Sequence, residues 1–416
     1  MQNIKIKLSL FINFFVIGIL LNSVGIVILQ VIEDYHVTKE AASVLEAFKD
    51  LSIAVFSFLI ASYIPKFGYK KSMLVALLTL ILASLLMKLI GGFFMSKMMF
   101  AMIGFSFALI KVSAYSTVGI ITNNADEHAS VMSVLEGIFM IGVLSGYWIF
   151  GFFIESTSST WLDTYWLLGA MSLLAFIMLF TTKLDESQVK KEGFKTIHEF
   201  LDMIALVRFA LVIIFIISAF FYVLIEQSIQ TWLPTFNRQI LFLPSSISVQ
   251  IVSILAGAIA LGRITGGYFI KKFHWMPVIT VCIVGAMLIV LLVVPLTSGY
   301  SKGDITSWSQ VPLAAYLLPC IGLFLGPIYP SLNSSILSVL PKNKQSAMTG
   351  LIVIFSALGG TTGSLITGQI FGRFNGQIAF YFTLVPITLL LIALFRYGKK
   401  RKNFVFIEAN FAVEYG

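Results

Sequence analysis

The sequence contains little charge: only 11% of its 416 residues are Asp, Glu, Lys or Arg, whereas soluble domains carry about 25%. It has only two cysteines, Cys282 and Cys320, and both lie inside apolar segments. This scarcity argues against a disulfide framework and against a cysteine metal site. No Walker loop and no pair of metal-binding histidines on one helix occurs. We therefore expect no catalytic residues, no metal and no cofactor.

Apolar residues are abundant instead, at 58% of the chain, and they form runs separated by short polar breaks. A run of about 20 apolar residues is long enough to cross a membrane as a helix. Strand-like alternation is absent, which favours helices over a barrel. We predict an all-α integral membrane protein with twelve transmembrane helices, at residues 8–32, 42–64, 72–91, 94–121, 130–154, 164–181, 209–235, 247–270, 276–296, 311–339, 346–372 and 377–396.

The longest charged interruption divides the chain near its midpoint. It predicts an N-terminal six-helix bundle at 1–182, a cytoplasmic linker at 183–208, a C-terminal six-helix bundle at 209–398 and a basic tail at 399–416. Lys and Arg concentrate in the loops on the side of the termini, which indicates that both termini are cytoplasmic in a multi-pass protein of the cell inner membrane. The net charge of +9 therefore reflects topology, and the basic run at 399–402 favours anionic lipid headgroups over nucleic acid.

Several ionisable residues lie inside the predicted spans, where a charge costs about 2.5 to 3.5 kcal/mol and indicates function. Glu46 and Asp50 share one helix face with Lys49 beside them. They form either a local ion cluster near the outer mouth or a proton site at Glu46 and Asp50. Lys111 lies halfway along its span, where it would pair with a carboxylate such as Glu226, bind an anionic substrate or lose its proton.

The span at 209–235 carries a polar stripe, because Tyr222, Glu226 and Gln230 recur at four-residue steps. Such a stripe faces the bundle interior, where it either binds a polar solute or joins the two halves. An aromatic ring beside it would stack on a solute. We predict that the residues for substrate and coupling are Lys111, Glu226, Gln227, Gln230, Tyr222, Trp232 and Asn333.

The loop after the second span resembles the major facilitator signature Gly-x3-Asp-Arg/Lys-x-Gly-x-Arg/Lys-Arg/Lys. Lys66, Gly68, Lys70 and Lys71 match it, whereas Ala61 replaces the first Gly and Pro65 replaces the Asp. The loop after the eighth span repeats its Lys-Lys pair, which indicates duplicated halves. In the family this loop clasps neighbouring helix ends, so the resemblance implies a conformational-switch loop made of Lys66, Gly68, Lys70, Lys71 and Arg263.

Three further stretches resemble the fucose:proton symporter branch of that family: Tyr222-x3-Glu226-x5-Trp232, Leu261-Gly262-Arg263-x2-Gly266 and Gly326-Pro327-x-Tyr329-Pro330. The resemblance implies a secondary transporter of a sugar-like solute that works by alternating access with proton coupling.

The coupling acids of that branch are missing, because Gly25 and Leu109 stand near their positions. An organic anion, an amino acid or a metal-chelating metabolite therefore stays open as substrate, as does a non-transporting receptor or sensor. The expected partners are a small-molecule substrate, protons and membrane lipids. We expect no nucleic-acid partner, and we expect the protein to be a monomer.

Overall fold

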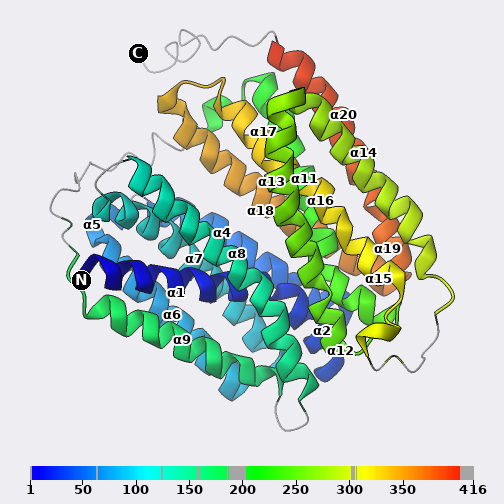
Figure 1. Cartoon of the computed structure of the whole chain (residues 1–416), viewed down its shortest axis with the longest axis horizontal. Coiled ribbons are helices and arrows are strands. Elements are labelled where there is room, and N and C mark those ends of the chain that lie inside the picture. The colour runs from blue at the N-terminus through cyan, green and yellow to red at the C-terminus, as the bar shows by residue number, and fades with distance from the viewer. Residues whose placement is uncertain are drawn as a thin grey trace.

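The computed structural model describes residues 2–61, 64–122, 125–156, 160–184, 186, 203–300, 305 and 307–402. Most of the predicted linker at 183–208, and the tail from residue 403, lie outside this part. All regular structure in the described residues is helical, and the helices form two bundles that lie side by side (Figure 1).

The N-terminal bundle contains the first six predicted spans, and its helices begin and end within six residues of the predicted bounds. Its elements are α1 (Gln2–Asn22), α2 (Val24–Asp34), α3 (Lys39–Ala42), α4 (Val44–Ala61), α5 (Ile64–Phe67), α6 (Tyr69–Ile90), α7 (Gly92–Ile121), α8 (Ala125–Glu155), η1 (Trp161–Asp163) and α9 (Thr164–Phe180).

The C-terminal bundle contains the other six spans. Three of them are divided into shorter helices, whereas the others are single long helices. Its elements are α11 (Ala210–Gln239), α12 (Ser245–Gln250), α13 (Val252–Phe273), α14 (Trp275–Val293), α15 (Leu313–Leu317), α16 (Ile321–Leu325), α17 (Ile328–Leu337), α18 (Lys342–Arg373), α19 (Gly376–Phe382) and α20 (Leu384–Lys402).

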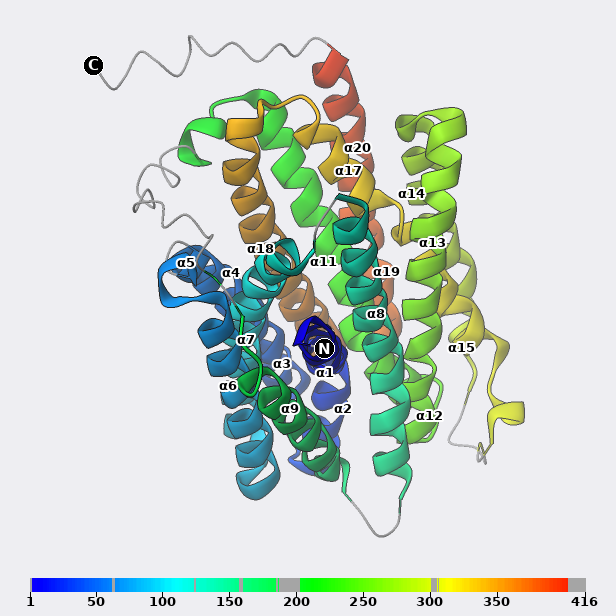
Figure 2. The ribbon, with the colours of Figure 1, turned by 60° about the vertical axis from the view of Figure 1, so that its left-hand side comes forward.

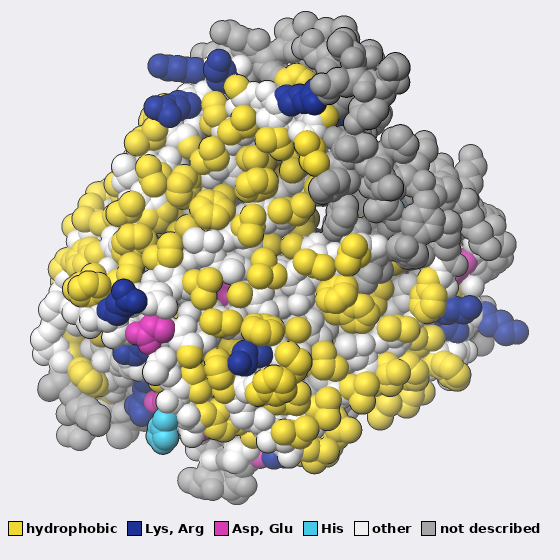
Figure 3. Space-filling view, turned by 180° about the vertical axis from the view of Figure 1, so that it is seen from behind, with side chains coloured by type: hydrophobic (Ala, Val, Ile, Leu, Met, Phe, Trp, Pro, Cys, Tyr) yellow, Lys and Arg dark blue, Asp and Glu magenta, His cyan; other side chains and the backbone are white. Residues whose placement is uncertain are grey.

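The membrane-spanning character of the fold is visible in its helices and its surface. Among the described residues, 11 helical segments are long and apolar enough to cross a membrane. The twelfth span is α4, whose 18 residues include Glu46, Lys49 and Asp50. Hydrophobic side chains cover most of the face shown in Figure 3, as expected of a surface that contacts lipid. The predicted all-α membrane fold with twelve spans in two bundles is confirmed.

Among the spans that are interrupted, two show a local cause. The first predicted span breaks at Ser23, between α1 and α2, where the Ser23 hydroxyl donates to the carbonyl oxygen of Leu20 at 2.8 Å. Such bonding back to the preceding turn bends helices. The span at 311–339 divides into α15, α16 and α17 near Pro319 and Pro327, because proline lacks an N–H and clashes with the preceding turn.

The two bundles contact each other at one end of the molecule. There α2 packs on α11, α4 on α18 and α8 on α12. Glycines permit this approach: a Cβ on Gly25 would lie 2.5 Å from the Thr231 carbonyl oxygen, and one on Gly151 would lie 2.7 Å from Gln250 Cγ. We name this the closed end. The bundles diverge towards the opposite end, which carries the start of α1 and the end of α20 and is named the termini end (Figures 1 and 2).

Candidate functional site

Three charged side chains are buried together in the first turns of α4. Glu46, Lys49 and Asp50 are 0%, 5% and 8% exposed. Lys49 Nζ donates to Glu46 Oε1 and lies 3.4 Å from Asp50 Oδ1. The spacing along the helix brings the three groups to one face, as the sequence predicts. We name these three residues the α4 cluster.

The α4 cluster is bonded to the other half of the molecule. Thr231 Oγ1 on α11 donates to Glu46 Oε2 at 3.0 Å and lies 3.3 Å from Gln227 Oε1. On α18, Gly360 makes room for the cluster, because a Cβ there would overlap Asp50 Oδ2. Helices from both halves therefore enclose these charges at the interface, on the side of the closed end.

The charges of the α4 cluster do not balance. One ammonium faces two carboxylates, so Glu46 and Lys49 form a neutral pair and Asp50 adds a surplus negative charge. An uncompensated charge in a low-dielectric interior costs several kcal/mol. A proton on one carboxylate removes the surplus. The cluster is therefore suited to bind and release a proton as the interface closes and opens to water.

The polar stripe of α11 continues from this cluster towards the termini end. Tyr222 OH donates to Glu226 Oε1 at 3.0 Å, and the Tyr222 ring stacks on Tyr329 of α17 with 5.4 Å between ring centroids. One turn from Glu226 towards the closed end, Gln230 Nε2 donates to Asn22 Oδ1 at 3.2 Å, next to the break between α1 and α2. The stripe thus combines hydroxyl, carboxylate and amide groups from three spans, which is the chemistry that binds a polar solute.

Two further predicted substrate residues differ in their surroundings. Trp232 is fully buried, donates from Nε1 to the Ser364 carbonyl oxygen at 3.1 Å and packs on Phe371, so in this structure it joins α11 to α18. Asn333 on α17 presents a buried Oδ1 without a hydrogen-bond partner in the described part of the chain. It retains an acceptor for a solute.

Lys111 and Glu226 are not paired in this structure. Lys111 is exposed, and its Nζ lies 5.4 Å from the centroid of the Phe107 ring. The next residue on the same face of α7 is Tyr115, whose hydroxyl donates to Glu136 of α8. No ion pair of Lys111 is found among the residues that the structure describes. The ammonium is thus available to another partner.

The signature loop is fixed to the end of the N-terminal bundle by Glu186. Gly68 precedes α6 with φ +101°, a conformation that favours glycine. The Glu186 carboxylate accepts the backbone N–H groups of Tyr69 at 3.1 Å and Lys70 at 2.8 Å. Lys70 Nζ donates to the Phe180 carbonyl oxygen at 3.0 Å, at the end of α9. An acid from after the sixth span therefore caps the helix whose own loop has lost the family's Asp.

The remaining residues predicted for the conformational-switch loop do not share these contacts with Glu186 and α9. Lys71 and Arg263 are exposed, and Arg263 lies on α13 in the C-terminal bundle. The side chain of Lys66 lies outside the described part of the chain. The structure thus places Arg263 in a different bundle from Gly68 and Lys70.

Replacing Gly68 with Ala is expected to lower the melting temperature of the purified protein. A Cβ at this position would lie 2.8 Å from Glu186 Oε2, and the left-handed backbone costs a non-glycine residue about 1 to 2 kcal/mol. Gly119→Ala is the matched control, because its Cβ would meet no atom within 4 Å. Equal melting temperatures for the two variants would contradict the contact with Glu186.

The sequence analysis did not identify several residues that contact the predicted site residues. Thr231, Asn22 and Tyr329 contact the predicted site residues, but neither composition nor charge distinguishes them from other polar residues in the spans. A usable signal for Thr231 is its place beside Gln230 and four residues after Gln227. No spacing rule connects Glu186 with Gly68, because the contact depends on how α9 packs against α6.

Comparison with known families supports the arrangement. The sequence matches the profile of the Major Facilitator Superfamily over residues 10–364. The comparison with curated proteins finds no significant match.

Among solved structures, the nucleoside transporter NupG shows 14% identity and a TM-score of 0.74, with 96% of this chain and 99% of that chain covered. A bacterial homolog of the human lysosomal transporter Spinster, in an inward-facing and unoccupied conformation, shows 13% identity and a TM-score of 0.73, with 98% and 99% covered. The D-xylose-proton symporter shows 12% identity and a TM-score of 0.73, with 98% and 100% covered. At these identities the similarity establishes the fold.

Proposed function

Since the chain belongs to the major facilitator superfamily, we propose that it is a secondary active transporter that moves a small polar solute by alternating access, coupled to protons. Membership of this family makes the protein a membrane transporter rather than an enzyme. The observation that carries the coupling is the α4 cluster, in which surplus buried charge lies at the interface between the two halves.

Alternating access is supported by the contrast between the two ends. At the closed end, Arg238 Nε donates to Glu33 Oε1, and Ser245 Oγ donates to Glu33 Oε2 at 2.7 Å. Trp148 Nε1 of α8 donates to Ser253 Oγ of α13 at 3.2 Å. With both termini in the cytoplasm, as the distribution of Lys and Arg favours, this is an inward-facing state, and one fold neighbour is a structure in that state.

The α4 cluster supplies the route for coupling in this proposal. In the inward-facing state the bonds from Thr231 to Glu46 and the contact of Gly360 with Asp50 keep the cluster from water. Opening of the closed end would separate α4 from α11 and α18 and hydrate the carboxylates. A proton would then bind from outside, and closure would carry it, neutralising the surplus charge, into the interface.

A sugar-like solute fits the α11 stripe best. Tyr222, Glu226, Gln227, Gln230 and Asn333 offer donors and acceptors in the pattern that several hydroxyl groups require. Two of the fold neighbours are named for a nucleoside and for D-xylose, both of which contain a sugar. An anionic solute is the second candidate, because Lys111 and Arg263 are both exposed and would bind it.

A thermal-shift screen of the purified protein tests this proposal. Sugars, nucleosides, amino acids and carboxylates would be added separately, since a ligand that binds only the folded state raises the melting temperature, by an amount that grows with its concentration. We expect sugars or nucleosides to raise the melting temperature of the wild type, and to raise that of Glu226→Gln by a smaller amount. If only carboxylates raise the melting temperature, and this effect is lost in Lys111→Met, the proposed solute is an organic anion and not a sugar. No shift from any of these classes would contradict the proposal.

The Glu33–Arg238 ion pair is expected to stabilise the inward-facing state modestly. The side chains are 25% and 40% exposed, and ion pairs of this kind contribute about 1 kcal/mol or less, which is at most about a five-fold change in a two-state equilibrium. In a background without Cys282 and Cys320, a cysteine replacing the buried Gln30 would report opening of the closed end through its rate of maleimide labelling.

Glu33→Gln should accelerate that labelling by up to about five-fold. The charge-swapped pair Glu33→Arg with Arg238→Glu is the control, and it should restore the slower rate. An unchanged rate in Glu33→Gln would show that the ion pair does not hold the closed end.

A further inference from the structure

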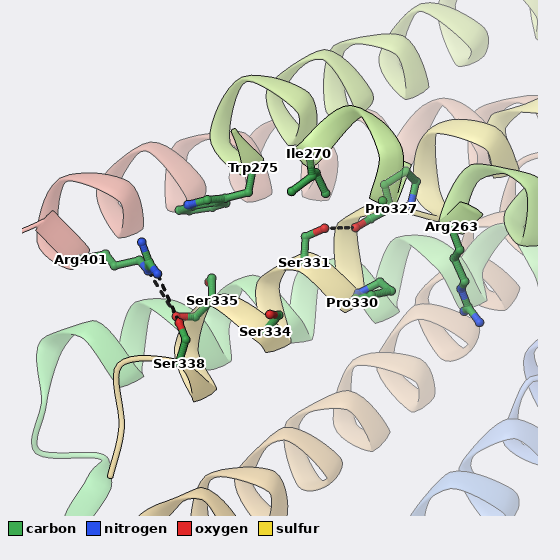
Figure 4. A pocket seen from close by; sticks show the side chains of 11 residues that line it. Arg263, Ile270, Trp275, Pro327, Pro330, Ser331, Ser334, Ser335, Ser338 and Arg401 are labelled. Atoms are coloured by element: carbon green, nitrogen blue, oxygen red, sulfur yellow. Dashed lines mark hydrogen bonds between the residues drawn. The ribbon is translucent and has the colours of Figure 1, made fainter. Parts of the chain in front are cut away.

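A cavity of about 330 Å³ lies inside the C-terminal bundle, at the termini end and away from the α4 cluster (Figure 4). One face of α17 lines it with four serines at helical spacing, and α13, α14 and α20 supply the remaining walls. Two arginines and no acidic residue are among its lining residues. These serines are Ser331, Ser334, Ser335 and Ser338, and we name the cavity the serine cavity.

Hydrogen-bond donors that the protein leaves partly unused converge on this cavity. Arg401 Nε donates to the Ser335 carbonyl oxygen at 3.2 Å, one terminal nitrogen donates to Ser338 Oγ at 3.3 Å, and the guanidinium also bonds to the Tyr397 hydroxyl, which leaves part of its five N–H groups for a ligand. Its guanidinium also lies 5.5 Å from the ring of Trp275, whose buried Nε1 has no partner among the described residues. Exposed Ser334 adds a hydroxyl. Cationic and neutral donors without acceptors favour an anion.

A second, more apolar cavity of about 290 Å³ adjoins the first and shares Trp275 and Arg401 with it. Phe395 and Met276 line it, and Gly398 keeps it open, because a Cβ there would lie 2.7 Å from the Met276 methyl carbon. A polar anion site beside an apolar cavity matches a molecule with a charged head and a hydrocarbon body.

The position in the membrane fits the same ligand. Trp275 begins α14 directly after α13 ends in Lys271 and Lys272, and Arg401 lies near the end of α20 beside Lys399. Helix ends that carry Trp and clustered basic residues lie at the level of lipid headgroups. The serine cavity is therefore accessible to headgroups on the side of the membrane that carries the termini.

We propose that this pair of cavities is a binding site for an anionic phospholipid, with its phosphate at Arg401, Trp275 and Ser334 and its acyl region along Phe395 and Met276. The groups assigned to the phosphate are not among those proposed for the transported solute. Its occupancy would link α20 to α14 and α17, and so stabilise the termini end of the C-terminal bundle.

Native mass spectrometry of the purified protein with phosphatidylglycerol tests the site, with phosphatidylcholine as the zwitterionic comparison. We expect the wild type to retain phosphatidylglycerol in preference, and Arg401→Gln to lose about ten-fold or more in affinity, as a charged hydrogen bond is removed. Arg396→Gln is the matched control: it makes the same charge change on α20 outside both cavities and should bind as the wild type does.

Because Arg401 also bonds to α17, Ser334→Leu provides a second variant that fills the cavity and breaks no hydrogen bond found in the described residues. It should reduce phosphatidylglycerol binding with the fold intact. Equal binding by the wild type and both variants, or equal retention of the two lipids, would overturn the proposal. Thermal protection by inorganic phosphate as strong as that by phosphatidylglycerol would assign the cavity to a soluble anion and also overturn it.

Discussion

The Asp50→Asn variant is expected to bind solute without exchanging protons with the solution. Asn is isosteric with the protonated carboxyl group, so the variant keeps the α4 cluster permanently in its neutral form, with Glu46 and Lys49 still paired. In the wild type, solute binding should take up or release protons, because it shifts the balance between states in which this cluster is wet or buried. Proton exchange is measured in weakly buffered detergent solution with a pH electrode, after adding the solute that gives the largest melting shift.

Glu136→Gln is the control for this prediction. It also removes a carboxylate from a span, but Glu136 accepts from Tyr115 and lies outside the α4 cluster. Its proton exchange should equal that of the wild type. If Asp50→Asn also exchanges protons as the wild type does, the cluster is an ion network that holds the helices together and not the coupling site.

Replacing Gly25 with Leu is expected to abolish transport by preventing closure of the closed end. A Cβ at Gly25 would lie 2.5 Å from the Thr231 carbonyl oxygen and 3.1 Å from its Cα, so a branched side chain must push α2 away from α11. Overpacking of this kind costs about 1 to 3 kcal/mol or more, and this cost falls only on the state in which the two helices touch. Uptake into proteoliposomes should fall by at least about ten-fold.

The same variant should label rapidly at a cysteine in place of Gln30, because the closed end stays open. Gly257→Leu is the control: a Cβ at Gly257 would meet no atom within 4 Å. It should retain both slow labelling and uptake. Loss of uptake in Gly25→Leu with slow labelling would show that the contact between α2 and α11 is not what separates the two states.

Much of the fold is predictable from hydropathy alone, because lipid imposes one length and one polarity on every span. The breaks were not predictable in the same way. Ser23 interrupts the first span through a local hydroxyl bond, which hydropathy does not register. Proline marks the division of the span at 311–339, yet proline is tolerated in other membrane helices, as Pro234 within α11 shows.

The site was predictable where its members belong to one helix. The spacing of Glu46, Lys49 and Asp50 places them together whatever the rest of the fold does, and the structure confirms their contacts. Contacts between helices depend on the rotation of each span and on the conformational state. For this reason the sequence suggested a pair between Lys111 and Glu226, whereas the structure gives Glu226 to Tyr222 and leaves Lys111 exposed.

The position of Gly25 explains how this chain differs from the branch it resembles. A carboxylate at that position would have no space beside Thr231, which approaches the backbone of α2 directly. The buried acids lie instead on α4, where Thr231 bonds to Glu46 from the other half.

Solute accumulation in proteoliposomes under an imposed pH gradient tests proton-coupled transport most directly. The probe is the sugar or nucleoside with the largest melting shift, and the comparison is the same vesicles after a protonophore has dissipated the gradient. We predict accumulation above equilibrium that the protonophore abolishes, with Asp50→Asn reaching equilibrium only. Equilibration without accumulation in the wild type, at the same rate with and without the gradient, would contradict coupling and leave a facilitative transporter.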